Sequence, residues 1–442
     1  MLGQLKPFCP LTQGCNPDLG RYLTEAPMEM TLAEHLAEAV RKEGQRNRYP
    51  DNFPHMPKIP AGRYRAALFH QLEMEHVWKK VWLFAGHASD IREPGEYFIF
   101  EKLDASVIVT RQSDGGIKAF HNSCRHRGSP VVMEAAGKTK RFVCPYHSWT
   151  YSLDGSLKAV PEEADFSCLE KESHGLLPVH CVEFRGLIFL SLSQDPEDFG
   201  SFADGLLNAF SLLPLEKMSV KGRIRVEVPC NWKAVIDNFN ESYHVKTLHQ
   251  NTVVRFLDSD SNHLELLKNG HVRGAVPRLV DNRFAQGDAP RLPDSDPLFD
   301  RLTLGLYMFP NNKATVNPLG FPWISVWPTG LNTSVYEATF LGWDNGDSKY
   351  VDYWKSVRDG TMSIVEEDLR VLMKIQKYLN NECFSGFTLN FVERTIYWCN
   401  EEIDRRIGDH NIPPDMRVEK VLEPTIDPSG SKWPLSQPIR GA

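Results

Sequence analysis

Cys124-Arg125-His126 and Cys144-Pro145-Tyr146-His147 are two short ligand arms, separated by seventeen residues, around which this 442-residue chain is organised. Each arm contributes one cysteine and one histidine, so the pair offers two thiolates and two imidazoles. Tetrahedral zinc and iron–sulfur clusters both accept two sulfur and two nitrogen ligands, so the ligand count leaves both alternatives open. The spacing predicts a four-ligand metal site at the two arms.

A Rieske [2Fe–2S] centre fits this ligand set, because two histidines replace two cysteines on one of its irons. One cysteine and one histidine on each arm allow the cysteines to bind one iron and the histidines the other. Two other interpretations are a structural zinc site and a set of buried side chains without a metal. A free-standing Rieske ferredoxin has similar arms but needs only a fraction of this length. The rest of the chain must therefore use the electrons.

The residues that flank the ligand arms carry a family resemblance. His126-Arg127-Gly128 and Cys144-Pro145-Tyr146-His147-Ser148-Trp149, followed by Tyr151-Ser152-Leu153-Asp154-Gly155, closely resemble the Rieske domain of the Rieske non-haem iron oxygenases. The resemblance extends over residues 60–410 and implies the α (terminal oxygenase) component of that family. The cluster ligands would be Cys124, His126, Cys144 and His147.

The composition is ordinary for a soluble globular protein, with 41% hydrophobic and 24% charged residues. The net charge of −7 and the lack of a clustered basic stripe argue against nucleic-acid binding. No apolar run is long enough to span a bilayer, and no secretory signal is evident, so no membrane association is expected. The nine cysteines show no disulfide-framework spacing, and an implied redox cluster favours the reducing cytoplasm.

A second informative stretch runs from Asn231 to His249. Taken as one helix, it places Asp237, Glu241 and His244 at i, i+4 and i+7, so their side chains project from one face. His249 is rotated away on a straight helix, so both histidines can bind one metal only if the helix ends or deforms between them. Two histidines and one carboxylate are the ligand set of non-haem Fe(II) oxygenases. Such residues also occur on plain polar surfaces, but the Rieske motif upstream favours a metal site, and the stretch resembles the mononuclear-iron motif of the family.

The third iron ligand must be a carboxylate from elsewhere in the chain. Residues 346–382 predict a long helix in which Asp368 has only apolar neighbours three and four positions away. Asp368 therefore points into the core, where an unpaired carboxylate is costly unless a cation compensates it. The alternative is a core salt bridge. Glu366 and Glu367 are expected to be solvated acids. The resemblance also implies a ligand acid on this late helix.

The predicted fold is α+β: an all-β Rieske domain followed by a helix-grip (START-like) catalytic domain with an antiparallel sheet and long helices. We expect an N-terminal extension over residues 1–60, the Rieske [2Fe–2S] domain over 61–198 and the mononuclear-iron domain over 199–442. Further helices are predicted over 31–43, with Thr31 and Glu34 forming a capping box, over 200–217 and over 391–407.

Alternating and β-branched runs predict the strands, with Asp114-Gly115 as a hairpin turn. In the Rieske part the predicted strands are 97–100, 106–111, 116–121, 141–143, 149–153, 156–160 and 186–192, and residues 181–192 close the domain. In the catalytic part they are 220–228, 304–309, 314–317, 323–327 and 334–342. Residues 259–300 are polar and rich in Asp, Pro and Gly, and we expect them to form a loop at the mouth of a substrate pocket.

The resemblance implies how the parts work together. In the family the subunits form a trimer, here α3 or α3β3, and the Rieske cluster of one subunit reduces the mononuclear iron of its neighbour. An acid three residues before the first ligand histidine bridges the two histidine systems across the interface. Here that acid would be Glu241, with Asp237 as the second candidate. Many ring-hydroxylating members have Asp at this position, whereas carnitine-type monooxygenases have Glu. The Fe(II) ligands would be His244, His249 and Asp368.

The expected activity is that of a terminal oxygenase, which uses O2 and NAD(P)H-derived electrons to hydroxylate a small aromatic or other hydrophobic substrate. No flavin- or NAD-binding fingerprint is apparent, so the electrons must come through a reductase, with or without a ferredoxin. One alternative is a monooxygenase or demethylase of quaternary ammonium or N-/O-methyl compounds. Another is an electron-transfer or ligand-binding protein without oxygenase activity. Aromatic candidates for the pocket wall are Tyr307, Phe309, Phe321, Trp323 and Trp327, which fit a trimethylammonium group, an aromatic ring or a sterol.

Overall fold

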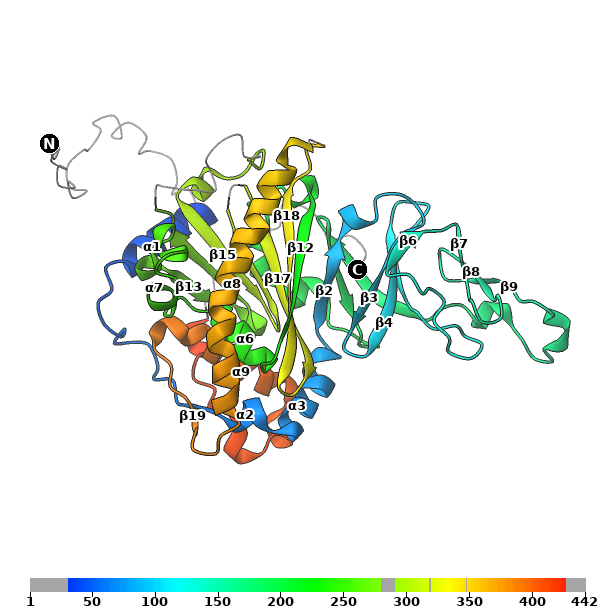
Figure 1. Cartoon of the computed structure of the whole chain (residues 1–442). Coiled ribbons are helices and arrows are strands. Elements are labelled where there is room, and N and C mark those ends of the chain that lie inside the picture. Colours follow the sequence, from blue (N-terminus) through cyan, green and yellow to red (C-terminus); the bar gives the residue numbers. More distant parts are fainter. Residues whose placement is uncertain (1–30, 280–290, 318, 347, 427–442) are drawn as a thin grey trace, which may run out of the picture.

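Figure 1 shows a large body, with one long helix across its front, and a β-rich projection at one end. The computed structural model describes residues 31–279, 291–317, 319–346 and 348–426. The projection consists of residues 82–191, and the body of the described residues on either side of them. None of the helices in the described ranges combines the length and apolarity that a bilayer crossing requires. The predicted α+β fold, with an all-β part that carries the ligand arms and a second part built on an antiparallel sheet, is confirmed.

The projection is built on a seven-stranded antiparallel sheet in the order β2-β11-β10-β5-β4-β3-β6. A three-stranded sheet, β7-β8-β9, follows at its far end. The strands are β2 (Trp82–His87), β3 (Glu96–Lys102), β4 (Ala105–Arg111), β5 (Ile117–His121), β6 (Ala136–Lys138), β7 (Arg141–Val143), β8 (Thr150–Ser152), β9 (Leu157–Ala159), β10 (Pro178–Phe184) and β11 (Leu187–Ser191). The turn at Asp114-Gly115 joins β4 and β5 as predicted.

The stretch 181–192, which is predicted to close the domain, is a hairpin, and the strand predicted over 186–192 corresponds to β11. The chain reverses at Arg185 and Gly186, whose φ values are 50° and 95°. Residues with positive φ end an extended strand and favour a tight turn. The outcome is the hairpin β10–β11, in which Phe184 pairs with Leu187.

The body contains a second seven-stranded antiparallel sheet, in the order β12-β18-β17-β16-β15-β14-β13. Its strands are β12 (Met218–Val228), β13 (His263–Leu266), β14 (Val272–Pro277), β15 (Leu302–Met308), β16 (Asn312–Val316), β17 (Gly320–Gly330) and β18 (Thr333–Trp343). The expected loop over 259–300 is wrong where β13 and β14 lie. Their polar residues Glu265 and Arg273 pair with each other at 2.7 Å in the interior, so polarity did not mean exposure. Residues 280–290 lie outside the described residues.

Helices cover the sheet of the body. The longest, α8 (Val351–Leu379), agrees with the predicted long helix and crosses the sheet (Figure 1). The others are α1 (Leu32–Glu43), α2 (Gly62–Arg65), α3 (Ala67–Glu73), α4 (Phe199–Phe202), α5 (Leu206–Phe210), α6 (Trp232–Phe239), α7 (Val245–Leu248) and α9 (Arg394–Ile407). The capping box of Thr31 and Glu34 is present. The predicted helix 200–217 is broken, because Gly205 has a φ of 77° and Pro214 follows.

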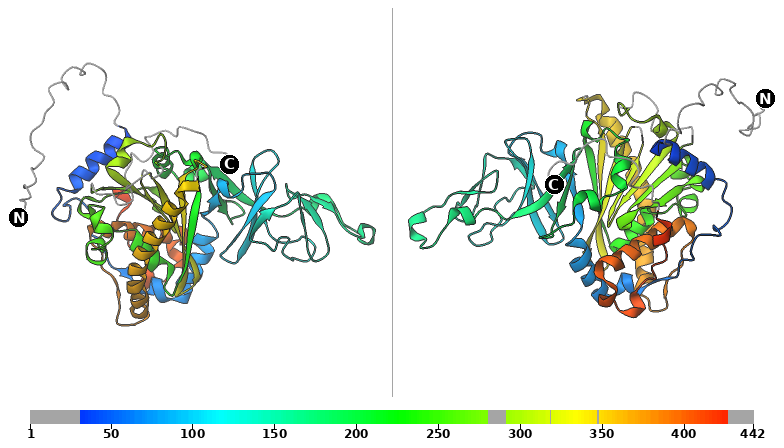
Figure 2. Two further views of the ribbon diagram at one scale, coloured as in Figure 1. Left: turned by 45° about the horizontal axis from the view of Figure 1, so that its top comes forward. Right: turned by 180° about the vertical axis from the view of Figure 1, so that it is seen from behind.

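The segment before the projection packs on the body. A short ribbon pairs β1 (Ile59–Pro60) with β19 (Gly386–Phe387). Arg63 forms a buried ion pair with Asp404 at 2.5 Å, and the rings of Trp78 and Trp232 lie 4.8 Å apart. Figure 2 shows α2 and α3, in blue, beside the red C-terminal helices at the bottom of the body. The described residues up to Trp78 therefore pack as part of the body.

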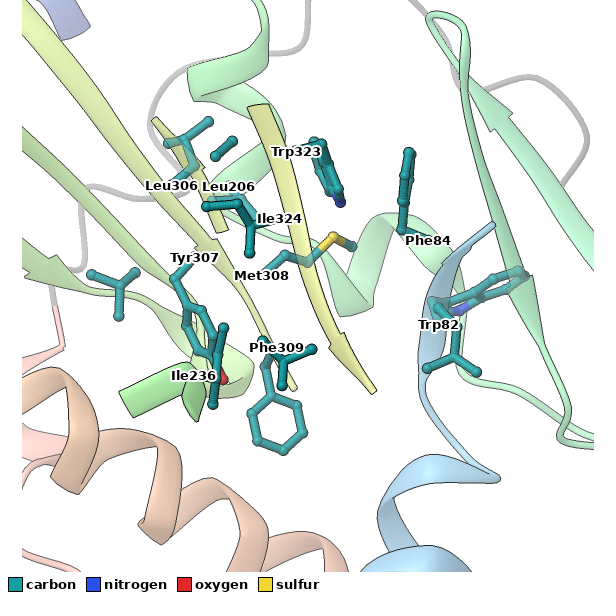
Figure 3. Packing of buried hydrophobic residues seen from close by; sticks show 14 of the residues in the cluster. Trp82, Phe84, Leu206, Ile236, Leu306, Tyr307, Met308, Phe309, Trp323 and Ile324 are labelled. Atoms are coloured by element: carbon teal, nitrogen blue, oxygen red, sulfur yellow. The ribbon is translucent and has the colours of Figure 1, made fainter. Parts of the chain in front are cut away.

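Two separate hydrophobic cores result. The larger core fills the body and extends into the seven-stranded sheet of the projection, through residues of β2, β3, β4, β5, β10 and β11. In Figure 3, Trp323 of β17 lies beside Phe84 of β2, and their ring centroids are 4.7 Å apart. The smaller core lies in the outer projection and includes Cys124 and Cys144. The ligand arms therefore sit on a core of their own.

Candidate functional site

The two ligand arms are tight turns that place sulfur inside and imidazole outside. The N–H groups of Gly128 and Ser148 donate to the carbonyls of Cys124 and Cys144, each at 2.9 Å, and close the turns. Both cysteines are buried, whereas His126 and His147 are half-buried. The two histidine Nδ1 atoms face each other at 3.2 Å. The structure thus brings all four predicted cluster ligands together.

Neighbouring aromatic residues hold the arms in place. The Tyr151 hydroxyl accepts the N–H of Arg125 at 3.0 Å, so its own hydrogen can be donated to the Cys124 sulfur, 3.2 Å away. Trp149 stacks on the His126 ring with centroids 5.0 Å apart. Burial, together with His147 and Arg127, lowers the pKa of His126, which favours the neutral imidazole that a metal ligand requires. This donor set fits a [2Fe–2S] cluster with two cysteine and two histidine ligands.

The second motif does not lie on one continuous helix. Helix α6 ends at Phe239, and α7 begins only after His244, so Asp237, Glu241 and His244 do not share a helix face as expected. On a straight helix His249 would be rotated away from His244. The break in the helix brings the two histidine rings together, with centroids 5.1 Å apart. The local reason is that α6 ends at Asn240, where the backbone leaves the helical region with a ψ of 0°.

The structure brings together the three predicted iron ligands. Nε2 of His249 lies 3.0 Å, and Nε2 of His244 3.7 Å, from Oδ1 of Asp368 on α8. One ligand atom from each residue lies within 4.8 Å of those of the other two. Asp368 is only 1% exposed, and within the described residues its Oδ1 has no hydrogen-bond partner. A buried carboxylate oxygen in that state is costly without a cation, and two histidines with one carboxylate favour Fe(II).

Two further carboxylates fix the orientation of the histidines. Glu241 accepts from Nδ1 of His244 and also from its backbone N–H. Glu367 accepts from Nδ1 of His249 at 2.6 Å and from the hydroxyl of Thr252 at 2.9 Å. Burial alone lowers the pKa of His249, but the carboxylates of Asp368 and Glu367 outweigh this effect and raise it. With protons held on Nδ1, the Nε2 atoms keep their lone pairs for a metal.

The expectation that Glu367 is a solvated acid is therefore wrong. Its contact with His249 joins residues 118 positions apart, so helix spacing gave no signal for it. Asp237 also differs from its predicted place on the face of Glu241 and His244. It is buried outside the cavity described below, accepts from the Tyr64 hydroxyl at 2.7 Å, and has its pKa raised by burial to about 7.

A cavity of about 340 Å³ adjoins the candidate iron site. It lies between the concave face of the body sheet, the segment from Asn238 to Asn262, and α8. Its wall is mostly apolar, and aromatic members are Phe239, Phe256, Phe321, Tyr336, Phe340, Tyr353 and Trp354. Sequence reasoning also missed two cationic members of the wall, Arg278 and Lys313.

Of the five aromatic residues predicted for the wall, only Phe321 lines the cavity. Trp323 and Trp327 do not line the cavity and pack instead against Phe84 and Trp78. Tyr307 donates its hydroxyl hydrogen to the carbonyl of Pro310 at 2.5 Å, and Figure 3 shows its ring in the core near Phe309. These four residues are buried in the body core and do not line the cavity.

Two family models match the chain. The model described as "Ring hydroxylating alpha subunit (catalytic domain)" matches residues 215–409, and the model described as "Rieske [2Fe-2S] domain" matches residues 81–173. The first range includes His244, His249 and Asp368. The second includes all four residues of the ligand arms.

Two branches of enzymes appear among the similar proteins. The chain is 34% identical over 207 residues to the glycine betaine monooxygenase oxygenase subunit of Chromohalobacter salexigens, covering 46% of each chain. It is 34% identical over 199 residues to the benzene 1,2-dioxygenase subunit alpha of Pseudomonas putida, covering 43% of this chain and 44% of that one. The chain thus spans about half the length of the curated relatives it matches.

Solved structures of both branches share the fold. A quaternary ammonium Rieske monooxygenase, described in connection with carnitine oxidation by gut microbiota, matches with a TM-score of 0.70 and 20% identity, over 81% of this chain and 99% of that one. Naphthalene 1,2-dioxygenase from Rhodococcus sp. bound to indole matches with a TM-score of 0.66 and 22% identity, over 85% of this chain and 98% of that one.

Proposed function

Because the chain belongs to the Rieske non-haem iron oxygenase family, as an alpha-type subunit with both family domains, we propose that it is a terminal oxygenase that hydroxylates a small organic substrate with O2 and NAD(P)H-derived electrons. One observation supports this most directly. His244, His249 and Asp368 meet beside an apolar cavity that can hold such a substrate. The chain also carries the four cluster ligands, so it has both an electron entry site and a site for oxygen chemistry.

The residues divide the work between them. When bound to the three ligands, a ferrous ion supplies O2 activation, with electrons that a Rieske cluster delivers. Glu241 and Glu367 hold the two imidazoles in one tautomer and orientation, so the Nε2 atoms stay directed at the metal position. The apolar wall excludes water and fixes the substrate next to the ligands, which raises the effective concentration of the reacting groups.

We further propose a homotrimer, α3 or α3β3, in which electrons pass from the cluster of one subunit to the iron of the next. Strands β7 and β8, which flank the second ligand arm, lie at the end of the molecule away from α7 and α8 (Figure 1). Glu241, already bound to His244, is the acid proposed to bridge to the neighbouring subunit. A cytoplasmic reductase, with or without a ferredoxin, is the proposed electron donor, and the free state of the described cysteines is compatible with that compartment.

The Glu241 role predicts a specific defect. Glu241→Gln should retain cluster and mononuclear iron, because neither ligand set changes, but should slow reoxidation of the reduced cluster by substrate and O2. Stopped-flow absorbance of the cluster measures this rate. Asp260→Asn, at an exposed acid paired with Lys246, is the control and should react as the native chain does. Equal reoxidation rates in the two variants would remove the bridging role from Glu241.

A second candidate function is a monooxygenase or demethylase of quaternary ammonium or N-/O-methyl compounds. The aromatic members of the wall, which include Tyr336, Tyr353 and Trp354, support it, because aromatic faces attract a trimethylammonium group. Similarity to glycine betaine and benzene oxygenase subunits supports both candidates equally. An electron-transfer or ligand-binding protein without oxygenase activity is a third and weaker candidate, since it does not explain why Asp368 is buried beside two histidines.

The decisive experiment is anaerobic EPR of the dithionite-reduced protein, with iron and labile-sulfide counts. A Rieske signal with roughly three irons and two sulfides per chain is expected from the two ligand sets. O2 consumption with a reductase, and product analysis with aromatic and quaternary ammonium substrates, then separate the two enzyme candidates. Zinc without sulfide would refute the oxygenase.

A further inference from the structure

Apart from its histidines, the described cavity wall contains two acidic and two basic residues. Glu241 and Asp368 are the acidic members of the described wall, and both are engaged at the histidines of the candidate iron site. Arg278 and Lys313 are its basic members. A ferrous ion would offset the charge of the two carboxylates. The two basic side chains then remain without an acidic partner in the wall.

Of the two basic residues, Lys313 gives the stronger indication of what the cavity binds. It lies in the middle of the sheet, on β16, opposite Tyr307 of β15 and Ile324 of β17. Its side chain is half-buried and passes over Gly305, where an added Cβ would lie 3.7 Å from Nζ. Thr315 and Asn317 continue the same face of the strand into the cavity. The ammonium group therefore belongs to the cavity and not to the outer surface.

This ammonium group lacks a partner. In the part of the chain that the structure describes, Nζ of Lys313 makes no hydrogen bond or ion pair. Burial lowers the pKa of Lys313 to about 8, although Cys399 and Glu241 act in the opposite direction. A partly desolvated ammonium group without an anionic partner is less stable than the same group in an ion pair. An anionic group that enters the cavity would therefore be stabilised by pairing with Lys313.

Arg278 adds a second cation near one end of the cavity. It follows β14, is half-buried, and donates to the hydroxyl of Thr303 at 3.3 Å. None of the described carboxylates lies within ion-pair distance of its guanidinium group. A substrate that is only a cation would meet repulsion from both side chains, and a neutral hydrocarbon would leave both without a partner.

From this wall we propose that the cavity binds an organic carboxylate, whose carboxylate group pairs with Lys313 while its apolar part lies among the aromatic residues. The proposal rests on the proposed oxygenase function for the fate of that molecule, but not for its binding. Two kinds of apolar part are compatible with the wall: an aromatic ring, or a trimethylammonium group that aromatic rings can surround. The shared recognition element is the carboxylate.

Calorimetry of the full-length, metal-loaded chain tests the proposal with two matched pairs of probes. Benzoate is compared with benzamide, and glycine betaine with choline, so that each pair differs in the carboxylate. The proteins compared are the native chain, Lys313→Met, Lys313→Arg and Lys118→Met. The last is the control, because Lys118 is exposed on β5. Thermal unfolding and iron counts establish that each variant is folded and loaded.

We expect the acid of at least one pair to bind more tightly than its neutral or cationic partner. Lys313→Met should weaken binding of that acid by about ten- to one-hundredfold, the range for a hydrogen bond to a charged group. Lys313→Arg should restore most of the affinity, and Lys118→Met should not change it. The pair that responds identifies the apolar part of the substrate.

Absence of acid binding, or a preference for the acid that survives in Lys313→Met, would overturn the proposal. Failure of the oxygenase function gives a different result. In that case the iron count or O2 consumption fails, while acid binding still depends on Lys313.

Discussion

Glu366 and Glu367 are consecutive on α8, but only Glu367 reaches a histidine. Its Oε2 lies 2.6 Å from Nδ1 of His249, whereas Glu366 is exposed. A carboxylate on the far nitrogen of a ligand histidine fixes the ring and raises its basicity toward the metal. The difference between the two acids is therefore a difference in metal affinity.

Glu367→Gln should weaken binding of the mononuclear iron by about 10–100-fold, because the histidine loses its anionic partner. Glu366→Gln is the matched control and should bind iron normally, and Asp368→Ala should lose the ion. Anaerobic Fe(II) titration, with cluster absorbance as an internal reference, measures the three affinities. If Glu366→Gln and Glu367→Gln bound iron equally, the contact with His249 would have no role in the site.

Individual residues differ in how far sequence could predict them. The ligand arms follow from ligand chemistry, and Asp368 follows from its apolar helical neighbours, because a buried acid needs a cation. The wall aromatics could not be predicted. Both faces of β17 are buried, one against the cavity and one against the projection, so hydrophobic alternation does not distinguish them.

At the scale of elements, the start of α8 packs closely on β18. Trp354 of α8 lies over Gly342 of β18, and a Cβ added at Gly342 would overlap the Trp354 ring. Trp354 is buried, so it cannot swing into solvent. Glycine at this position lets the start of the helix approach the sheet closely, and the same helix carries Asp368 fourteen residues later.

Gly342→Ala should destabilise the protein by about 1–3 kcal/mol, the usual cost of overpacking, and should also lower occupancy of the mononuclear iron. Gly305→Ala is the control for stability, because an added Cβ there makes only ordinary contacts, at 3.7 Å or more. Denaturant unfolding and iron counts check both effects. If the Gly342→Ala protein were destabilised but kept normal iron occupancy, the packing of α8 at Gly342 would have no effect on the iron site.

A buried histidine links β14 to α4. Nε2 of His271 donates to the carbonyl of Phe202 at 2.6 Å, and its Nδ1 accepts the N–H of Phe309 at 3.0 Å. Burial lowers the pKa of His271 to about 3, so the folded protein keeps it neutral. In the unfolded chain it takes up a proton near its ordinary pKa of about 6.5.

The stability that His271 contributes is therefore complete above about pH 6.5 and is lost as pH falls from there toward 3. The limiting slope for one proton is about 1.4 kcal/mol per pH unit. His271→Asn should be less stable at pH 7 but should lose less stability between pH 6.5 and 5, because an amide does not titrate. Melting temperatures over this pH range test it, and parallel curves for the two proteins would contradict it.

The elements themselves were mostly predictable. Strands with clear alternation and turn residues, such as β4 and β5, appear where expected, as does α8. Errors arose where local signals conflict with tertiary contacts. The stretch around β13 and β14 is polar because Glu265 and Arg273 form an interior ion pair, and the break after α6 depends on packing that spacing does not reveal.

At the scale of the whole molecule, the two separate hydrophobic cores predict that the cluster can be lost without loss of the mononuclear iron. The ligand arms belong to the smaller core, while His244, His249 and Asp368 belong to the body. Cys124→Ser or His147→Ala should abolish the visible colour of the cluster and leave the mononuclear iron bound, because the body core is not touched. Absorbance with iron and sulfide counts measures both metals. Intact colour would refute the ligand assignment, and loss of all iron would show that the two parts do not fold separately.

The order of the two main parts was predictable, because two independent motifs occur in the order of the resembling family, and both family models match. The place of the N-terminal segment was not. Arg63 and Glu73 are ordinary charged residues in the sequence, and only the fold reveals their buried partners Asp404 and Lys233. Contacts between residues far apart in the chain leave no mark in local patterns.

The chain enters and leaves the projection through neighbouring strands. Trp82 of β2 pairs with Ser191 of β11, and both strands are anchored in the body core, whereas the smaller core lies beyond them. A segment whose two ends are held side by side can be exchanged at little cost in loop-closure entropy. A recombination that exchanges the outer projection between relatives would therefore leave β2 and β11 in place, and under the proposed function it would replace the electron-transfer site without altering the substrate cavity.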